Sequence, residues 1–184
     1  MYIHNRNGYR IKDATDPIWY SLNEYNYKIF CTLTFYHQNH RDDSAKASAL
    51  RVGLLKRFLT NFRCYFKLNQ KNFEFFYSIE QSSLNDYHIH LLFSNRGLED
   101  KDVQSIYNYI VFIWNKVCDS PFCKLHMDEV KEETKTRLVR YVSKRNIDPL
   151  SGIIDADNYM SPALFKTLKK IADSKDGKTL TLQS

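Results

Sequence analysis

Two histidines separated by one residue lie within a short apolar run, YHIHLLFS, at residues 87–94. The run predicts a β-strand, because it is rich in aromatic and branched apolar residues. Side chains alternate between the two faces of a strand, so His88 and His90 point to the same side. Imidazole nitrogen is a common ligand of divalent cations, which makes this pair a candidate metal site.

A carboxylate on the preceding strand is expected to complete this site. Residues 72–81, NFEFFYSIEQ, predict a strand, and the five residues 82–86 suit a hairpin loop. Antiparallel pairing across that loop puts Glu80 opposite His88, about 4.5–5.5 Å away at Cβ. Glu80, His88 and His90 could then hold one divalent cation and leave positions open for water or substrate. The alternative is two half-exposed histidines with Glu80 as their ion-pair partner.

A basic segment downstream carries a tyrosine. Residues 134–145, TKTRLVRYVSKR, predict a helix in which Arg137, Tyr141 and Lys144 share one face. Residues 134–146 contain five cations and no acid: Lys135, Arg137, Arg140, Lys144 and Arg145. Such a face attracts a phosphodiester, and nearby positive charge favours the nucleophilic phenolate of tyrosine. The alternative is a solvated basic helix with the tyrosine packed at its rim.

The remaining patterns describe the scaffold that must position these groups. Strands are predicted over 25–36, 72–81, 87–94 and 122–130, and helices over 45–66, 100–117, 134–145 and 162–172. This order predicts an α+β fold, an antiparallel sheet of four to five strands with helices packed on one face. We expect a single domain over 1–184, with the motifs within 30–144 and with 1–24 and 150–184 peripheral. A turn is predicted at Asp16-Pro17.

Two of the helices show clear buried stripes. The expected core-facing residues of the first are Ala47, Leu50, Leu54, Phe58, Phe62 and Tyr65. Those of the second are Val103, Ile106, Ile110, Ile113 or Trp114, and Val117. Both stripes repeat at three-to-four spacing, which predicts that each helix packs against the sheet.

Composition favours a nucleic-acid partner. The formal net charge is +6 and 15% of the residues are aromatic, so cations are available for phosphates and rings for bases. No apolar run approaches the roughly 20 residues of a membrane span. The first residues lack the apolar stretch of a signal peptide, so we expect a cytoplasmic, DNA-associated protein without a membrane partner.

Three motifs together resemble those of HUH endonucleases, and among them the rolling-circle replication initiators of small plasmids and single-stranded DNA phages or viruses. FCTLTF at 30–35 is similar to the first motif, HIHLLF at 88–93 to the second, and YVSK at 141–144 to the third. The resemblance is to the single-tyrosine class, since no second tyrosine lies one turn from Tyr141. It implies a ferredoxin-like or RRM-like fold.

The resemblance also implies roles for individual residues. His88 and His90, with Glu80, would bind a divalent metal, Mn²⁺ or Mg²⁺. Tyr141 would attack single-stranded DNA at a replication origin, which can be a hairpin, giving a 5′-phosphotyrosine and a 3′-hydroxyl. Lys144 would orient the phosphate. Host replication proteins are expected partners.

Further residues are expected to contact DNA. Thr32 and Thr34 share one face of the first strand and would line the DNA groove if that strand lies beside the histidines. Threonine is also simply a good strand former. On the basic helix, Arg137, Arg140 and Arg145 are expected to contact phosphates.

Other interpretations of the same chain stay open. A transposase or mobilisation relaxase would use the same chemistry, and a non-catalytic single-strand-binding module would need no metal. Cys118, Cys123 and His126 are a weak candidate for zinc, because a fourth ligand is missing. Tyr107 and Tyr109 follow a helical pattern and are expected to pack rather than to react.

Overall fold

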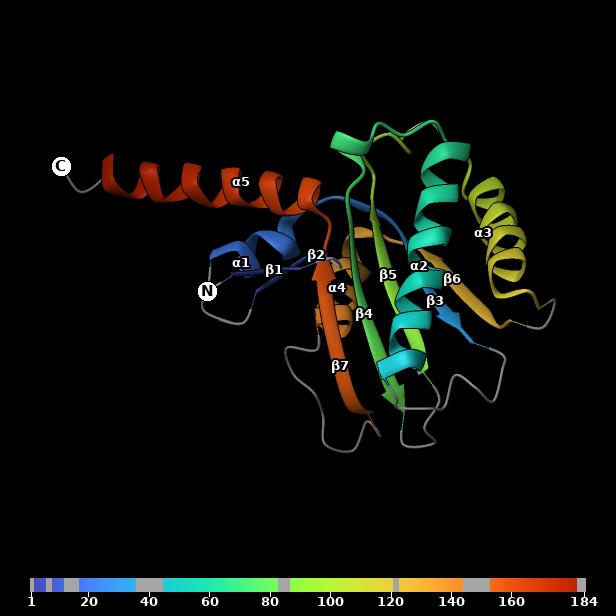
Figure 1. Cartoon of the computed structure of the whole chain (residues 1–184). Coiled ribbons are helices and arrows are strands. Elements are labelled where there is room, and N and C mark those ends of the chain that lie inside the picture. The colour runs from blue at the N-terminus through green and yellow to red at the C-terminus, as the bar shows by residue number, and fades with distance from the viewer. Residues whose placement is uncertain are drawn as a thin grey trace.

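The structure of the protein is a computed structural model that describes residues 2–5, 8–11, 17–35, 45–82, 87–120, 123–143 and 153–181. Its centre is a seven-stranded sheet with the order β1-β2-β7-β4-β5-β3-β6, in which neighbouring strands are antiparallel (Figure 1). The strands are β1 Tyr2–Asn5, β2 Gly8–Ile11, β3 Tyr27–Thr34, β4 Phe75–Ser82, β5 Tyr87–Ser94, β6 Leu125–Glu129 and β7 Ile153–Met160. The predicted α+β class is confirmed.

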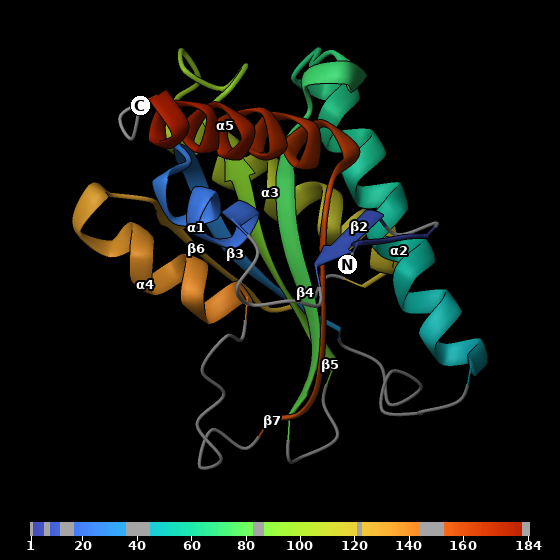
Figure 2. The same ribbon diagram turned by 90° about the vertical axis from the view of Figure 1, so that its left-hand side faces the viewer.

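Helices cover both faces of the sheet (Figures 1 and 2). They are α1 Pro17–Glu24, α2 Ala45–Tyr65, α3 Val103–Cys118, α4 Glu132–Ser143 and α5 Pro162–Thr181, with a 3-10 turn, η2, at Gln70–Asn72. The prediction that all helices pack on one face is therefore wrong. The reason is visible in β5, where the consecutive residues Leu91 and Leu92 point to opposite faces and are both fully buried.

The α2 and α3 helices form one layer. Phe58 and Phe62 of α2 pack with Trp114 of α3 against this face of the sheet. The buried residues of α3 are Ile106, Ile110, Ile113, Trp114 and Val117, as the predicted stripe requires. Two residues of the α2 stripe were predicted wrongly, because Leu50 and Tyr65 are 49% and 60% exposed.

The α1, α4 and α5 helices cover the other face. Leu138 and Val142 of α4 pack with Phe30 of β3 and Leu92 of β5 in a second apolar cluster. The α5 helix contributes to the same cluster through Leu164, Leu168 and Ala172. The helix that carries the predicted nucleophile therefore lies on the face opposite to α2 and α3.

Three parts of this scaffold differ from the prediction. The Asp16-Pro17 turn is replaced by α1, which begins at Pro17, a residue favoured in the first turn of a helix. No strand is predicted after Pro149, yet β7 pairs with β4 from Phe76↔Met160 to Ser82↔Ile153. The last helix extends to Thr181 rather than 172. Within the part of the chain that is described, no helix has the length and apolarity to span a bilayer.

Candidate active site

Two polar rows cross three neighbouring strands at one end of the sheet, on the face covered by α4. Reading β3, β5 and β4 in turn, the rows are Thr32–His90–Ser78 and Thr34–His88–Glu80. The next row along the same face, Phe30–Leu92–Phe76, is apolar and buried. The polar rows therefore lie where the apolar core of this face ends.

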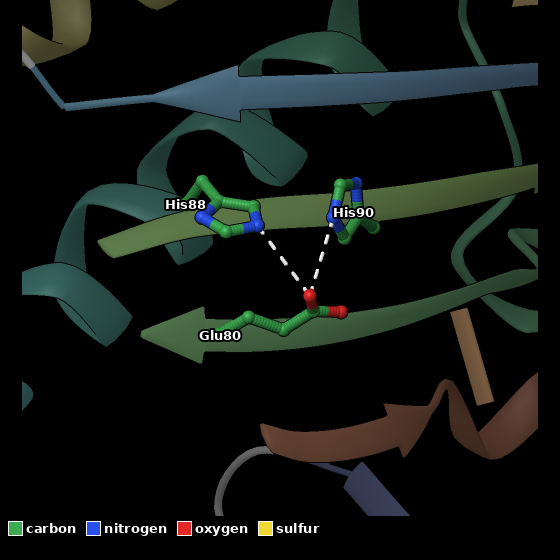
Figure 3. Close-up of side chains that lie close together, drawn as sticks. All are labelled: Glu80, His88 and His90. Carbon is green, nitrogen blue, oxygen red and sulfur yellow. Dashed lines mark ion pairs between the residues drawn. The ribbon is translucent and has the colours of Figure 1, made fainter. Parts of the chain in front are cut away.

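Glu80, His88 and His90 converge within this polar region (Figure 3). Glu80 Oε2 lies 3.4 Å from His88 Nε2 and 3.3 Å from His90 Nε2. One ligand atom from each residue lies within 4.8 Å of the others, so the three could hold a metal ion. The predicted register, with Glu80 opposite His88, is confirmed.

The donor set of this triangle fits a divalent cation. Two imidazole nitrogens and one carboxylate oxygen are ligands that Mn²⁺ and Zn²⁺ accept readily, and Mg²⁺ through the oxygen. Glu80 is fully buried and His90 is 2% exposed, whereas the His88 side chain is 18% exposed. Solvent or substrate would therefore reach the triangle from the side of His88.

Two hydroxyl groups hold these side chains in place. Ser78 Oγ donates a hydrogen bond of 2.6 Å to Glu80 Oε1, while Oε2 of that carboxylate faces the imidazoles. Thr32 Oγ1 lies 2.8 Å from His90 Nδ1, while Nε2 of that ring faces Glu80. Such neighbours orient metal ligands and fix the histidine tautomer. These positioning roles were not predicted, although Ser78 has the same strand parity as Glu80.

The other predicted groove-lining threonine has a different partner. Thr34 Oγ1 donates to the backbone oxygen of Lys124 on the approach to β6, at 2.8 Å. The β3 strand does lie beside the histidine strand, with Thr32 opposite His90 and Thr34 opposite His88. The placement on which the groove-lining prediction depends is thus present.

Glu80 remains ionised in this setting. Burial raises the pKa of its carboxyl, but hydrogen bonds from His88, His90 and Ser78 outweigh burial and lower that pKa well below the usual range. A buried carboxylate that stays charged between two imidazoles is suited to attract a cation.

Tyr141 of α4 lies directly beside the triangle. Its ring centroid is 4.6 Å from that of His90 and 6.2 Å from that of Phe30. Burial of Leu138 and Val142 fixes the helix, while Tyr141 itself is 45% exposed. The structure therefore brings together the predicted nucleophile and the predicted metal ligands, which lie more than 50 residues apart in the sequence.

The protonation of Tyr141 differs from the expectation. Burial, and then the negative charge of Glu80, raise the pKa of the phenol above its ordinary value. The prediction that neighbouring cations of the chain favour the phenolate is therefore wrong for the described residues. The position of the hydroxyl rather than its acidity is what suits Tyr141 to reaction.

The remaining candidates fall outside this site. Arg137 and Arg140 are exposed on α4, whereas Lys144 and Arg145 lie outside the described residues. His126 pairs with Asp128 at 3.0 Å on β6. The Glu80 triangle is the one metal-binding group found among the described residues, so the zinc candidate with Cys118 and Cys123 does not form.

Tyr107 and Tyr109 lie on α3, in the helical layer on the opposite side of the sheet from the triangle. The Tyr109 hydroxyl donates to the backbone oxygen of Asn61 at 3.1 Å. Tyr109 therefore packs against α2, as expected from the helical pattern.

Comparison with known proteins adds one finding. Residues 28–146, nearly two thirds of the chain, match a family of replication-associated proteins, the ORF2 family. This span includes the triangle, its supporting hydroxyls and Tyr141. No curated protein and no solved structure matches the chain.

Proposed function

The chain belongs to the ORF2 family of replication-associated proteins, a family of rolling-circle replication initiators, and we propose that it nicks and rejoins single-stranded DNA at a replication origin through Tyr141. The observation that carries this proposal is the 4.6 Å approach of the Tyr141 ring to His90, beside three groups that could hold a metal. A nucleophile next to a cation site is the arrangement that phosphoryl transfer requires.

Glu80, His88 and His90 are the proposed ligands of a divalent cation, Mn²⁺ or Mg²⁺. When bound, this cation would act as a Lewis acid and stabilise charge on the oxygens of the scissile phosphate. Ser78 and Thr32 would keep the carboxylate and the imidazole oriented toward it. The exposed edge of His88 would face the incoming DNA.

Tyr141 is the proposed nucleophile. Its Oη forms a bond to phosphorus while the bond from phosphorus to the 3′-oxygen breaks, which leaves a 5′-phosphotyrosine. The phenol loses its proton and the departing 3′-oxygen gains one, so the step conserves protons. One phosphodiester replaces another, so the exchange is nearly thermoneutral. The 3′-hydroxyl can reverse it and reseal the strand without ATP.

Residues around the nucleophile are proposed to hold the DNA. Arg137 and Arg140 of α4 would contact phosphates, as would Arg145, and Lys144 would orient the scissile group. Thr32 and Thr34 face the same side of the sheet as the histidines and would line the path of the strand. Such contacts favour a single strand whose phosphate can reach the triangle.

The biological setting follows from the family. An initiator would act on the DNA of its own replicon in the cytoplasm, where host replication proteins would extend the 3′-hydroxyl. A transposase or relaxase could use the same chemistry. Tyr141 follows the histidines in the sequence, whereas relaxases often place the tyrosine before them.

Formation of a covalent adduct tests this function. The protein would be incubated with Mn²⁺ and single-stranded oligonucleotides that tile the DNA flanking its own gene, then resolved on denaturing gels. We expect a DNA-linked band for the wild type and none for Tyr141→Phe or for the double variant His88→Ala/His90→Ala.

Tyr107→Phe serves as the matched control, because Tyr107 lies on the opposite side of the sheet. It should form the adduct at the wild-type rate. An adduct that survives Tyr141→Phe would disprove the assignment of the nucleophile. Binding without any adduct, unaffected by metal, would instead favour a non-catalytic DNA-binding module.

A further inference from the structure

The outer surface of the α2–α3 layer carries positive charge without compensating acids. The two helices contain six cations and no carboxylate: Lys46, Arg51, Lys56, Arg57, Arg63 and Lys116. Arg51 is buried over the ring of Tyr87, and the other five reach solvent. The average composition of the chain would give about four acids in a stretch of this length. By contrast, α4 and α5 both contain acids. Charge of one sign on one face attracts a polyanion.

Aromatic rings lie on the same surface. Tyr65 of α2 stacks on Tyr109 of α3, with ring centroids 3.7 Å apart and planes inclined by 11°. Phe112 lies one turn further along α3, 6.4 Å from Tyr109. Tyr65 and Phe112 are each 60% exposed. Large rings held in place yet left in solvent are unusual in a surface that serves only to cover a core.

The rings and the cations form one continuous strip. Lys116 Nζ lies 5.9 Å from the centroid of the Phe112 ring. The pKa of the Cys118 thiol is raised by Cys123 and by burial, and the charge of Arg57 opposes this rise. Arg57 therefore lies beside the C-terminal end of α3, where Lys116 also lies. We call Tyr65, Tyr109, Phe112, Lys116 and Arg57 the α2–α3 strip.

We propose that the α2–α3 strip binds single-stranded DNA at a second site, on the opposite side of the sheet from Tyr141. Its exposed rings would stack on unpaired bases, and Arg57 and Lys116 would contact the adjoining phosphates. The favoured partner is a single strand, because the bases of a duplex are already stacked and are not open to Tyr65 or Phe112. This site would hold DNA beyond the position of the nick, so it rests on the proposed function only for its biological role.

Salt-dependent binding tests the strip. The affinity for 5′-fluorescein-labelled (dT)20 would be measured by anisotropy, in EDTA, over a range of NaCl concentrations. The double variant Arg57→Ser/Lys116→Ser should reduce the slope of log K against log salt by about 1.4, since each phosphate contact on single strands contributes about 0.7. Tyr65→Ser/Phe112→Ser should bind about tenfold more weakly or worse.

The matched control removes the same charge elsewhere. Lys166→Ser/Lys170→Ser changes two exposed lysines of α5 and should leave the slope at the wild-type value. Circular dichroism would establish that each variant is folded. Adduct formation on a short oligonucleotide that covers only the nick should be normal in the Arg57→Ser/Lys116→Ser variant, so this test is separate from that of Tyr141.

Cross-linking locates the contact directly. Irradiation with (dT)15 carrying one 5-iododeoxyuridine should attach DNA to peptides that contain Tyr65 or Phe112. Unchanged slopes in the strip variants, with cross-links confined to α4 and the central strands, would overturn the proposal. So would a wild-type dimer in sedimentation that the strip variants make monomeric without loss of DNA affinity, because the strip would then bind a second copy.

Discussion

Two hydroxyl groups, rather than further charges, hold the ligands of the Glu80–His88–His90 triangle in position. Ser78 donates to the carboxylate oxygen that faces away from the imidazoles, and Thr32 contacts the ring nitrogen of His90 that faces away from Glu80. A hydroxyl orients its partner without adding charge to the site. The net charge that a bound cation meets is therefore set by Glu80.

Removal of the Ser78 hydroxyl should weaken metal binding. In Ser78→Ala, Glu80 loses its donor at Oε1 and the carboxylate can rotate, so we expect the Mn²⁺ affinity to fall about 10-fold or more. Isothermal titration with Mn²⁺ measures this directly. The control is Ser174→Ala, since Ser174 bonds to the backbone of its own helix α5. Equal affinities in the two variants would show that Ser78 does not orient Glu80.

The two threonines of β3 offer a matched pair. Thr32→Val removes the contact with His90 Nδ1, so we expect the Mn²⁺ affinity to fall about 10-fold or more. Thr34→Val makes the same change two residues further along, but its hydroxyl serves the Lys124 carbonyl, so the affinity should stay near that of the wild type. A similar loss in both variants would indicate a general effect of the strand.

At the scale of elements, a buried carboxylate ties the other end of the sheet together. Glu74, which precedes β4, is 2% exposed and accepts hydrogen bonds from four side chains. The donors are the Tyr25 hydroxyl, Ser94 Oγ, Arg96 Nη1 and Thr167 Oγ1. They come from the turn after α1, the end of β5, the turn that follows it, and α5. The core under α4 is therefore closed at the end away from the triangle.

This junction should give the protein a distinct alkaline sensitivity. Burial and the Glu74 carboxylate raise the pKa of Tyr25 to about 12, against about 10 in an unfolded chain. A raised pKa stabilises the fold fully below pH 10, and the contribution is lost as the pH rises toward 12. We expect the free energy of unfolding to fall in this window by up to about 2 kcal/mol more in the wild type than in Tyr25→Phe.

Urea unfolding at pH 9, 10 and 11 would measure this difference. Tyr20→Phe is the control, because Tyr20 is 57% exposed, and it should follow the wild type. Parallel curves for Tyr25→Phe and the wild type would show that the Tyr25 proton does not contribute.

At the scale of the whole molecule, the segment after the family match is part of the core. The match ends at residue 146, but β7 pairs with the strand that carries Glu80, and Glu80 itself lies opposite Ala156. Leu164 and Leu168 of α5 are fully buried in the cluster beneath α4. The residues of the candidate site and some of those that make it foldable therefore occupy different parts of the chain.

A fragment limited to residues 28–146 should consequently fail to fold. It would expose one edge of β4 and lose the α5 side chains, and truncation of two buried leucines alone costs about 4–10 kcal/mol, comparable to the stability of a whole domain. Thermal melts followed by circular dichroism would compare it with residues 1–184. A cooperative melt of the fragment, with Mn²⁺ binding retained, would contradict this expectation.

The sequence carried the chemistry more clearly than the scaffold. Alternation in β4 and β5 and the length of their loop were enough to place Glu80 opposite His88. The segments α1 and β7 were missed because their patterns are weak. The acidic stretch IIDADNYM becomes a strand through pairing with β4, a long-range effect that local propensity does not report. The placement of α4 depended likewise on which face α2 and α3 left open.

The link between β6 and α4 gives the sheet mechanical control over Tyr141. Only Val130 and Lys131 separate the two elements, and Val130 N donates to the backbone oxygen of Lys28 at 2.9 Å. Tyr141 lies nine residues from the first residue of α4, roughly 14 Å along its axis. A tilt of about 5° at the root would swing the tyrosine by about 1 Å, and such a displacement can slow a reaction about 100-fold. The outer edge of the sheet is thus a lever on the nucleophile, and strain applied there would be felt as a change in rate.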